Sequence, residues 1–136
     1  NRLSSQKISA LSSLRDHFLS LVTDRISGVE VFGDLENTLP NTLNLGFEGV
    51  EGDTLLIALD MAGLAVSTGS ACSSGAGIPS PVLTAMGIPT NKINSSIRFS
   101  LGFSTTMSEV EKSAEILVRT VSLNRTSKYN VRTIKT

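Results

Sequence analysis

The close spacing of two expected strands constrains the fold more than any other feature of this sequence. A short apolar segment, Val29–Phe32, is followed after residues 33–41 by a segment in which Leu43, Leu45 and Phe47 alternate with smaller or polar residues. A parallel crossover needs about a dozen residues or more, so these strands are too tightly linked for one. The alternation also indicates that one face of the second strand is buried and the other is not.

The first expected helix precedes these strands and runs from Leu3 to about Ile26. Arg15, Asp16 and Asp24 are expected on its solvent side. Its apolar residues recur at three- and four-residue steps, which is typical of an amphipathic helix; they are Ile8, Leu11, Leu14, Phe18, Leu21, Val22 and Ile26.

Further short elements are expected along the rest of the chain. They are a helix from Gly52 to Met61 stopped by Gly63, a very short strand at Leu64–Val66, a brief helix capped by Ser80 and closed by Gly87, and a fourth strand with Ile97, Phe99 and Leu101 on one face. Strands and helices interleaved in this way predict an α+β fold. In that fold a small antiparallel or mixed sheet of about four strands is covered by helices, mostly on one face.

The last expected helix has two overlapping start signals. Thr106-x-x-Glu109 and Ser108-x-x-Glu111 both have the capping-box pattern, and either could begin the helix. Its inner face is expected to comprise Val110, Ala114, Leu117, Val118 and Val121. Residues 126–136 lack periodicity and carry only basic charges, so they are expected to form a basic, mobile tail.

Length and composition exclude several classes of protein. The 136 residues are enough for one domain with a sizeable core. The 12 basic and 12 acidic residues cancel, so no partnership with nucleic acid is expected. No apolar run is long enough to span a membrane, and no signal peptide is expected. The chain begins at Asn1 without a methionine, so it is expected to be a piece of a longer protein or a processed product.

A stretch of small and polar residues, Ser67–Gly77, holds the only cysteine, Cys72. A thiol that only fills space is more often found among Leu, Ile and Val, whereas a thiol on a pliable loop can be delivered to a partner atom. A chance cysteine in a surface loop is the competing interpretation. An ordinary thiol has a pKa of about 8.5. Since no Lys, Arg or His lies between Arg25 and Lys92, groups that activate this thiol have to come from elsewhere.

Three segments, Ser67–Ser74, Pro79–Leu83 and Ser95–Gly102, resemble the C-terminal domain of cysteine desulfurases, in the branch with the longer, mobile cysteine loop. The similarity runs in order from about Leu11 to about Leu123. It implies membership of the class-V aminotransferases and the small-domain fold of fold-type I pyridoxal-phosphate enzymes. Such enzymes use pyridoxal 5'-phosphate to convert L-cysteine to L-alanine, and they hold the sulfur as a persulfide on the loop cysteine. The resemblance therefore implies that Cys72 is the catalytic nucleophile.

Arg98 is the second candidate site residue. Its neighbours Ile97 and Phe99 are expected to point into the core, which puts Arg98 on the opposite face of the strand. A guanidinium on a rigid strand can bind a carboxylate through two parallel hydrogen bonds. The alternative is an ordinary solvated arginine. The resemblance implies that Arg98 binds the α-carboxylate of the substrate cysteine.

The resemblance also implies partners and a location. The sulfur would pass to an acceptor such as an iron–sulfur scaffold protein or a thio-cofactor assembly system. The full-length protein would be a homodimer in the cytoplasm, or in an organelle matrix if the source is eukaryotic. One cysteine and one histidine, His17, cannot build a closed metal site, although Cys72 could be a shared iron–sulfur ligand in a scaffold complex. His17 is expected on the helix surface or partly packed, and Asn41 and Asn44 are expected to form hydrogen bonds in the sheet and its turn.

The expected organisation is a desulfurase-like domain over residues 1–125, with the cysteine loop at 67–78, followed by the tail at 126–136. The large domain that binds pyridoxal phosphate is absent from this chain, and no lysine here has the setting of the one that holds the cofactor. The chain alone is therefore expected to be inactive. The alternative is a free-standing sulfur-carrier or interaction module that receives a persulfide on Cys72 without pyridoxal-phosphate chemistry of its own. Such a carrier has no need of a carboxylate-binding arginine.

Overall fold

The computed structural model describes residues 2–33, 40–64, 66–68, 70–71, 78–79, 85 and 87–125. The helices in this part of the chain are α1 (Arg2–Arg25), α2 (Gly52–Met61), α4 (Thr90–Asn94) and α5 (Met107–Asn124). The strands are β1 (Val29–Phe32), β2 (Thr42–Phe47), β3 (Ser67–Thr68), β4 (Ser70–Ala71), β5 (Ile78–Pro79) and β6 (Ser96–Ser100).

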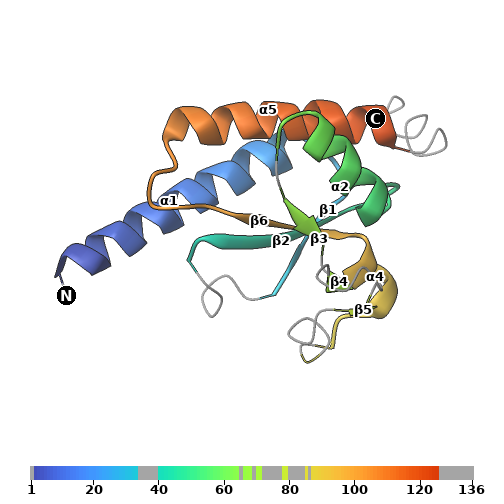
Figure 1. Cartoon of the computed structure of the whole chain (residues 1–136), viewed down its shortest axis with the longest axis horizontal. Helices are drawn as coiled ribbons and strands as arrows, with labels where there is room; N and C mark the ends of the chain where they lie inside the picture. The colour runs from blue at the N-terminus through green and yellow to red at the C-terminus, as the bar shows by residue number, and fades with distance from the viewer. Residues whose placement is uncertain are drawn as a thin grey trace.

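Four of the strands form one antiparallel sheet in the order β1-β2-β6-β3. Helices α1 and α5 lie side by side over one face of this sheet, and α2 packs beside α5 (Figure 1). The short helix α4 and the ladder formed by β4 and β5 lie at the other side of the sheet (Figure 1). The predicted α+β class, with helices mostly on one face of a sheet of about four strands, is confirmed.

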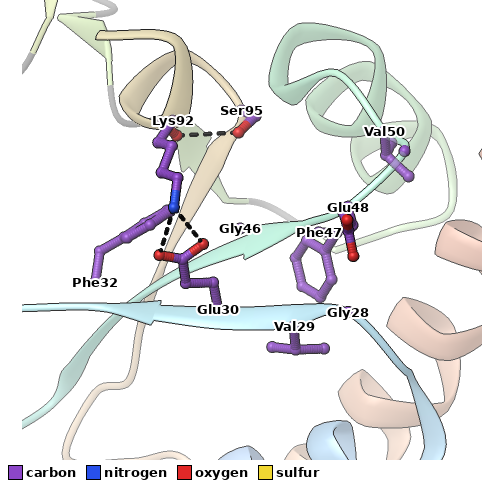
Figure 2. A pocket seen from close by; sticks show the side chains of 11 residues that line it. Gly28, Val29, Glu30, Phe32, Gly46, Phe47, Glu48, Val50, Lys92 and Ser95 are labelled. Carbon is purple, nitrogen blue, oxygen red and sulfur yellow. Dashed lines mark hydrogen bonds and ion pairs between the residues drawn. The ribbon is translucent and has the colours of Figure 1, made fainter. Parts of the chain in front are cut away.

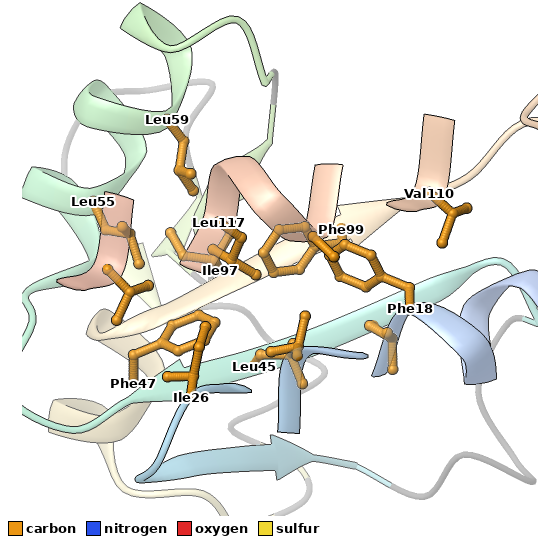
Figure 3. Packing of buried hydrophobic residues seen from close by; sticks show 14 of the residues in the cluster. Phe18, Ile26, Leu45, Phe47, Leu55, Leu59, Ile97, Phe99, Val110 and Leu117 are labelled. Carbon is orange, nitrogen blue, oxygen red and sulfur yellow. The ribbon is translucent and has the colours of Figure 1, made fainter. Parts of the chain in front are cut away.

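The main core fills the space between the sheet and α1, α2 and α5 (Figure 3). Within this core the rings of Phe18 and Phe99 are tilted against each other with their centroids 5.2 Å apart. The residues of β2 and β6 that were predicted to point inward are buried. Those of α5 are buried too, except Val118, which is half-buried. The fully buried side chains include Leu43, Leu45, Leu55, Leu59, Ile97, Leu117 and Val121.

One expectation for α1 is wrong: Arg15 is buried, with only 6% of its surface exposed. Leu11, Arg15, Phe18 and Val22 follow one another at steps of three and four residues, so Arg15 lies within the stripe that packs on the core. Its aliphatic stem can be covered there while its Nε donates a hydrogen bond to Asp16 Oδ1 at 3.1 Å.

The start of α5 resolves the choice between the two capping patterns. The backbone N–H of Glu109 donates to Thr106 Oγ1 at 3.1 Å, and the N–H of Thr106 donates to Glu109 Oε1 at 2.9 Å. Thr106 is therefore the N-cap, and Ser108 lies inside the first turn. At the other end of the helix, the Arg125 guanidinium donates to the carbonyl oxygens of Glu48 and Ser27, which fastens α5 to two turns of the chain.

The expected strand at Leu64–Val66 is wrong in position. Gly63 adopts a φ of +95°, and the N–H of Leu64 donates to the carbonyl of Leu59 at 2.8 Å, so Leu64 still belongs to the end of α2. Strand pairing with β6 begins only at Ser67. The brief helix expected after Ser80 lies largely outside the described residues, although Gly87 has the positive φ, +79°, expected where it closes.

Candidate functional site

Polar residues occupy the face of the sheet that points away from α1, α2 and α5. Asn44 of β2 and Arg98 of β6 are on this face, because their neighbours along each strand lie in the core. The strand register places four residues in one line across the sheet: Phe32 opposite Asn44, Asn44 opposite Arg98, and Arg98 opposite Ser67. We call these four residues the Arg98 row.

The position predicted for Arg98 is confirmed. Arg98 is exposed, while Ile97 and Phe99 on either side of it are buried. Its strand is paired along both edges, with β2 on one side and β3 on the other. The backbone that carries the guanidinium is therefore fixed by hydrogen bonds in both directions, which suits a group that must hold a planar anion in one orientation.

The predicted nucleophile, Cys72, lies outside the described residues, but residues 67–68 and 70–71, which precede it, are described. Ser67 at the start of β3 pairs directly with Arg98. Ala71 immediately precedes Cys72 and pairs with Ile78 of β5, so the chain enters and leaves the cysteine segment at the same place. Cys72 is five positions beyond Ser67 in the sequence, and an extended chain of five residue steps spans at most roughly 17 Å.

A pocket of about 540 Å³ opens beside the Arg98 row, next to β1 (Figure 2). Its lining includes Phe32 and Gly46, together with an ion pair in which Lys92 Nζ lies 3.1 Å from both carboxylate oxygens of Glu30. Arg98 does not line this pocket. The pocket and the row share only Phe32, so the pocket is a neighbouring cavity and does not enclose the guanidinium.

Sequence reasoning missed α4 and the small second core that it builds. Phe32 and Ile93 are buried against each other with Ile88 packed beside them, on the side of the sheet opposite the main core. The signal was present in β1, where Val29 and Val31 point to one face, so the large apolar Phe32 must point to the other. A phenylalanine on the polar face indicates that part of this face is covered.

The two asparagines of the β2 region have different surroundings. Asn41 Nδ2 donates to the carbonyl of Leu101 at 2.9 Å, and the Leu101 N–H donates to the carbonyl of Asn41, so the expected role in the sheet is confirmed for Asn41. The side chain of Asn44 makes no hydrogen bond within the described part of the chain, so the same expectation is wrong for the Asn44 side chain. Asn44 is half-buried and beside Arg98.

The remaining histidine and lysines lie away from the Arg98 row. His17 is partly packed between helices, with Nε2 3.8 Å from Glu111 Oε1, as predicted. Lys7 lies over the ring of Phe103, Lys92 is paired with Glu30, and Lys112 is exposed on α5. A lysine that binds pyridoxal phosphate has to be available as a neutral amine in a desolvated site. These three lysines do not fit that group, and we derive no step through it in this chain.

No helix among the described residues is long and apolar enough to cross a bilayer, and the same residues contain no cluster of three or more metal-binding side chains of the His, Cys, Asp and Glu types.

Known proteins resemble this chain in sequence and in fold. The chain is 43% identical over 121 residues to the cysteine desulfurase IscS of Dictyoglomus turgidum, a match that covers 89% of this chain and 31% of that protein. It is 42% identical over 104 residues to a cysteine desulfurase of Nostoc sp., covering 76% of this chain and 26% of that protein. A solved NifS-like protein superimposes with a TM-score of 0.70 at 28% identity, over 85% of this chain and 28% of that one.

The chain thus spans less than a third of the length of these relatives. A second solved structure, a NifS-like protein from Rickettsia africae, has the same fold with a TM-score of 0.66 over 85% of this chain. Residues 1–112 match the aminotransferase class-V family, and by this match, which extends over most of its length, the chain belongs to that family.

Proposed function

We propose that this chain is the C-terminal part of a pyridoxal-phosphate-dependent cysteine desulfurase, with Cys72 as the persulfide carrier and Arg98 as the group that binds the α-carboxylate of L-cysteine. The names and identity of the relatives support the activity. One structural observation carries the residue roles: the strand that leads to Cys72 pairs, at Ser67, directly with Arg98. A carboxylate bound at Arg98 is thereby within reach of the cysteine segment.

The proposed sulfur transfer needs no added oxidant or reductant. The Cys72 thiolate attacks the sulfur of L-cysteine, and an S–S bond forms while the substrate Cβ–S bond breaks. The electron pair of the broken bond passes to carbon, which takes up a proton and becomes the methyl group of alanine. Pyridoxal phosphate, when bound, is the electron sink that weakens the Cβ–S bond, and we propose that residues outside this chain hold it. Arg98 fixes the carboxylate end of the substrate, so its sulfur is presented in one direction.

We further propose that residues 1–125 are the folded domain and residues 126–136 a tail. The end of α5 at Asn124, with Arg125 fastened to two turns, supports this boundary. As in the enzymes it resembles, the full-length protein would be a homodimer that passes sulfur to an acceptor protein such as an iron–sulfur scaffold. A thiol that has to remain reduced to act as a nucleophile suits the cytoplasm or an organelle matrix.

The decisive experiment compares the full-length protein with its Cys72→Ser variant. After mixing with L-cysteine, intact mass should show a gain of about 32 Da per persulfide on the unmodified protein and no gain on the variant, because a hydroxyl is a far weaker nucleophile toward sulfur. L-cysteine should still change the absorbance of the cofactor in the variant. If Cys72→Ser gains the sulfur, or forms alanine at the unmodified rate, the loop thiol has no role and the proposal is wrong.

The same measurement separates the alternative, a sulfur carrier without cofactor chemistry. Such a carrier would accept sulfur on Cys72 from a persulfide donor but would not release alanine from L-cysteine. Its sulfur acceptance would also be indifferent to Arg98→Ala, since no carboxylate has to be bound.

A further inference from the structure

The strand register places Asn44 directly opposite Arg98 on β2, as it places Ser67 on β3. Residues directly opposite each other on neighbouring antiparallel strands have Cβ atoms about 4.5–5.5 Å apart, within reach of side-chain hydrogen bonds. Asn44 is opposite Arg98, and both belong to strands in the middle of the sheet. The backbone therefore holds the starting points of the two side chains next to each other, independently of any loop.

Two features of Asn44 distinguish it from a structural asparagine. Its side chain makes no hydrogen bond within the described part of the chain, whereas Asn41 in the same segment is used to bind the Leu101 carbonyl. It is also half-buried, so its amide is partly withdrawn from water. A side-chain amide in that state has both donors and its acceptor available for a ligand.

On the side away from Arg98, Asn44 is flanked by the ring of Phe32. Phe32 is the register partner of Asn44 on β1 and is buried against Ile93. The ring of Phe32 crosses Gly46 so closely that an added Cβ there would lie 2.8 Å from it. Asn44 thus stands between a fixed ring and a guanidinium, and a ligand that reaches its amide has to come from the open face on which Arg98 lies.

From this geometry we infer that Asn44 is a second residue of the carboxylate site, and that it sets the preference for substrates with an α-carboxylate. Its Nδ2 donates a hydrogen bond to one carboxylate oxygen while Arg98 binds the carboxylate through its guanidinium, and its Oδ1 can accept from the guanidinium and hold it in plane. The inference rests on the proposed role of Arg98.

The test uses the full-length protein with its cofactor and two ligands, L-cysteine and cysteamine, which is the same aminothiol without the carboxylate. Binding of each is followed by the change in cofactor absorbance. A hydrogen bond to a charged group that is lost on truncation lowers affinity by about tenfold to a hundredfold. We expect Asn44→Ala to weaken L-cysteine by that factor and to leave cysteamine within about twofold.

Three further variants sharpen the result. Asn44→Asp has the same shape but puts a negative charge beside the carboxylate, so it should weaken L-cysteine more than Asn44→Ala does and should not weaken cysteamine. Ser100→Ala, on the same face of β6 and two residues from Arg98, is the matched control and should change neither ligand. In an Arg98→Ala background the effect of Asn44→Ala should shrink, because the two residues act on one group.

The outcomes separate this inference from the proposed function. If Arg98→Ala selectively weakens L-cysteine but Asn44→Ala weakens both ligands equally or neither, Asn44 is structural and the inference is overturned while the function stands. If Arg98→Ala itself fails to discriminate between the ligands, the carboxylate site is elsewhere and both fail.

Discussion

At the scale of single residues, the polar face of the sheet depends on where strand alternation puts each side chain. Arg98 is exposed between two buried neighbours, and its strand is paired on both edges. In its proposed role as a carboxylate-binding group, the planar fork of the guanidinium matters as much as its charge. The charge alone is therefore not expected to be sufficient.

Arg98→Lys in the full-length protein tests this distinction. The ammonium keeps the charge but loses the two parallel hydrogen bonds, so the substrate is bound more weakly and is also misplaced. We expect KM for L-cysteine to rise and kcat to fall, with kcat/KM reduced by about tenfold to a hundredfold. Arg119→Lys, on the exposed side of α5, is the control. Unchanged kinetics with L-cysteine would show that Arg98 does not bind the substrate.

Gly46 is constrained by close packing. A Cβ at this position would lie 2.8 Å and 2.9 Å from the ring of Phe32, and that ring is buried against Ile93 and cannot easily move away. We expect Gly46→Ala to lower the free energy of unfolding by about 1–3 kcal/mol, measured by urea denaturation. Gly102→Ala should change little, since its nearest atom would be 3.9 Å away. Phe32→Leu should recover part of the loss in the Gly46→Ala background; strictly additive effects would argue against a clash.

At the scale of elements, helix ends decide where the strands begin. Gly63 ends α2 in a left-handed conformation, and the Leu64 N–H still bonds to the helix, so β3 begins later than its apolar residues suggested. That delay brings Ser67, and not Leu64, opposite β6. The end of α2 thus sets which residue of β3 pairs with Arg98.

The start of α5 provides a direct test of capping. Both hydrogen bonds of the capping box are formed by Thr106 and Glu109, and neither involves Ser108. We expect Thr106→Ala to destabilise the protein by about 0.5–2 kcal/mol in chemical denaturation, because the side-chain acceptor for a backbone N–H is lost. Ser108→Ala, two residues away, should stay within about 0.5 kcal/mol. The reverse order would mean that the helix begins at the second pattern.

At the scale of the whole molecule, pairing of β3 with β6 brings Ser67 opposite Arg98, and the described lysines lie elsewhere. The described lysines are exposed or engaged with Glu30 and Phe103. Such settings do not provide the desolvated site that a lysine bound to pyridoxal phosphate needs. In the proposed reaction the electron sink is therefore not held by the lysines of the described part of the chain.

This leads to a prediction for the chain as it stands. Incubated with pyridoxal phosphate and dialysed, it should keep no stoichiometric, borohydride-sensitive absorbance band. The control is the same chain unfolded in urea, which reports ordinary reaction of the cofactor with surface lysines. A band that is stoichiometric in the folded chain and disappears on unfolding would show that a cofactor-binding lysine is present after all.

The sequence alone was sufficient for the elements with a strong period. The apolar steps of α1 and α5, the alternation of β2 and β6, and the position of Arg98 on the polar face all follow from local spacing, because side-chain direction in a helix or strand is fixed by its geometry. Arg15 was placed wrongly because its charge was given more weight than its place in the buried stripe.

Only the tertiary structure decided which residues are neighbours across the sheet. Spacing along the chain contains no information on register between strands, so the row that joins Phe32, Asn44, Arg98 and Ser67 could not be predicted. The second core around Ile93 likewise depends on α4 folding back over β1, which is a contact between distant segments. The sequence determined the chemistry of each side chain and the face on which it lies, and backbone pairing across the sheet determined which of them can act on one ligand.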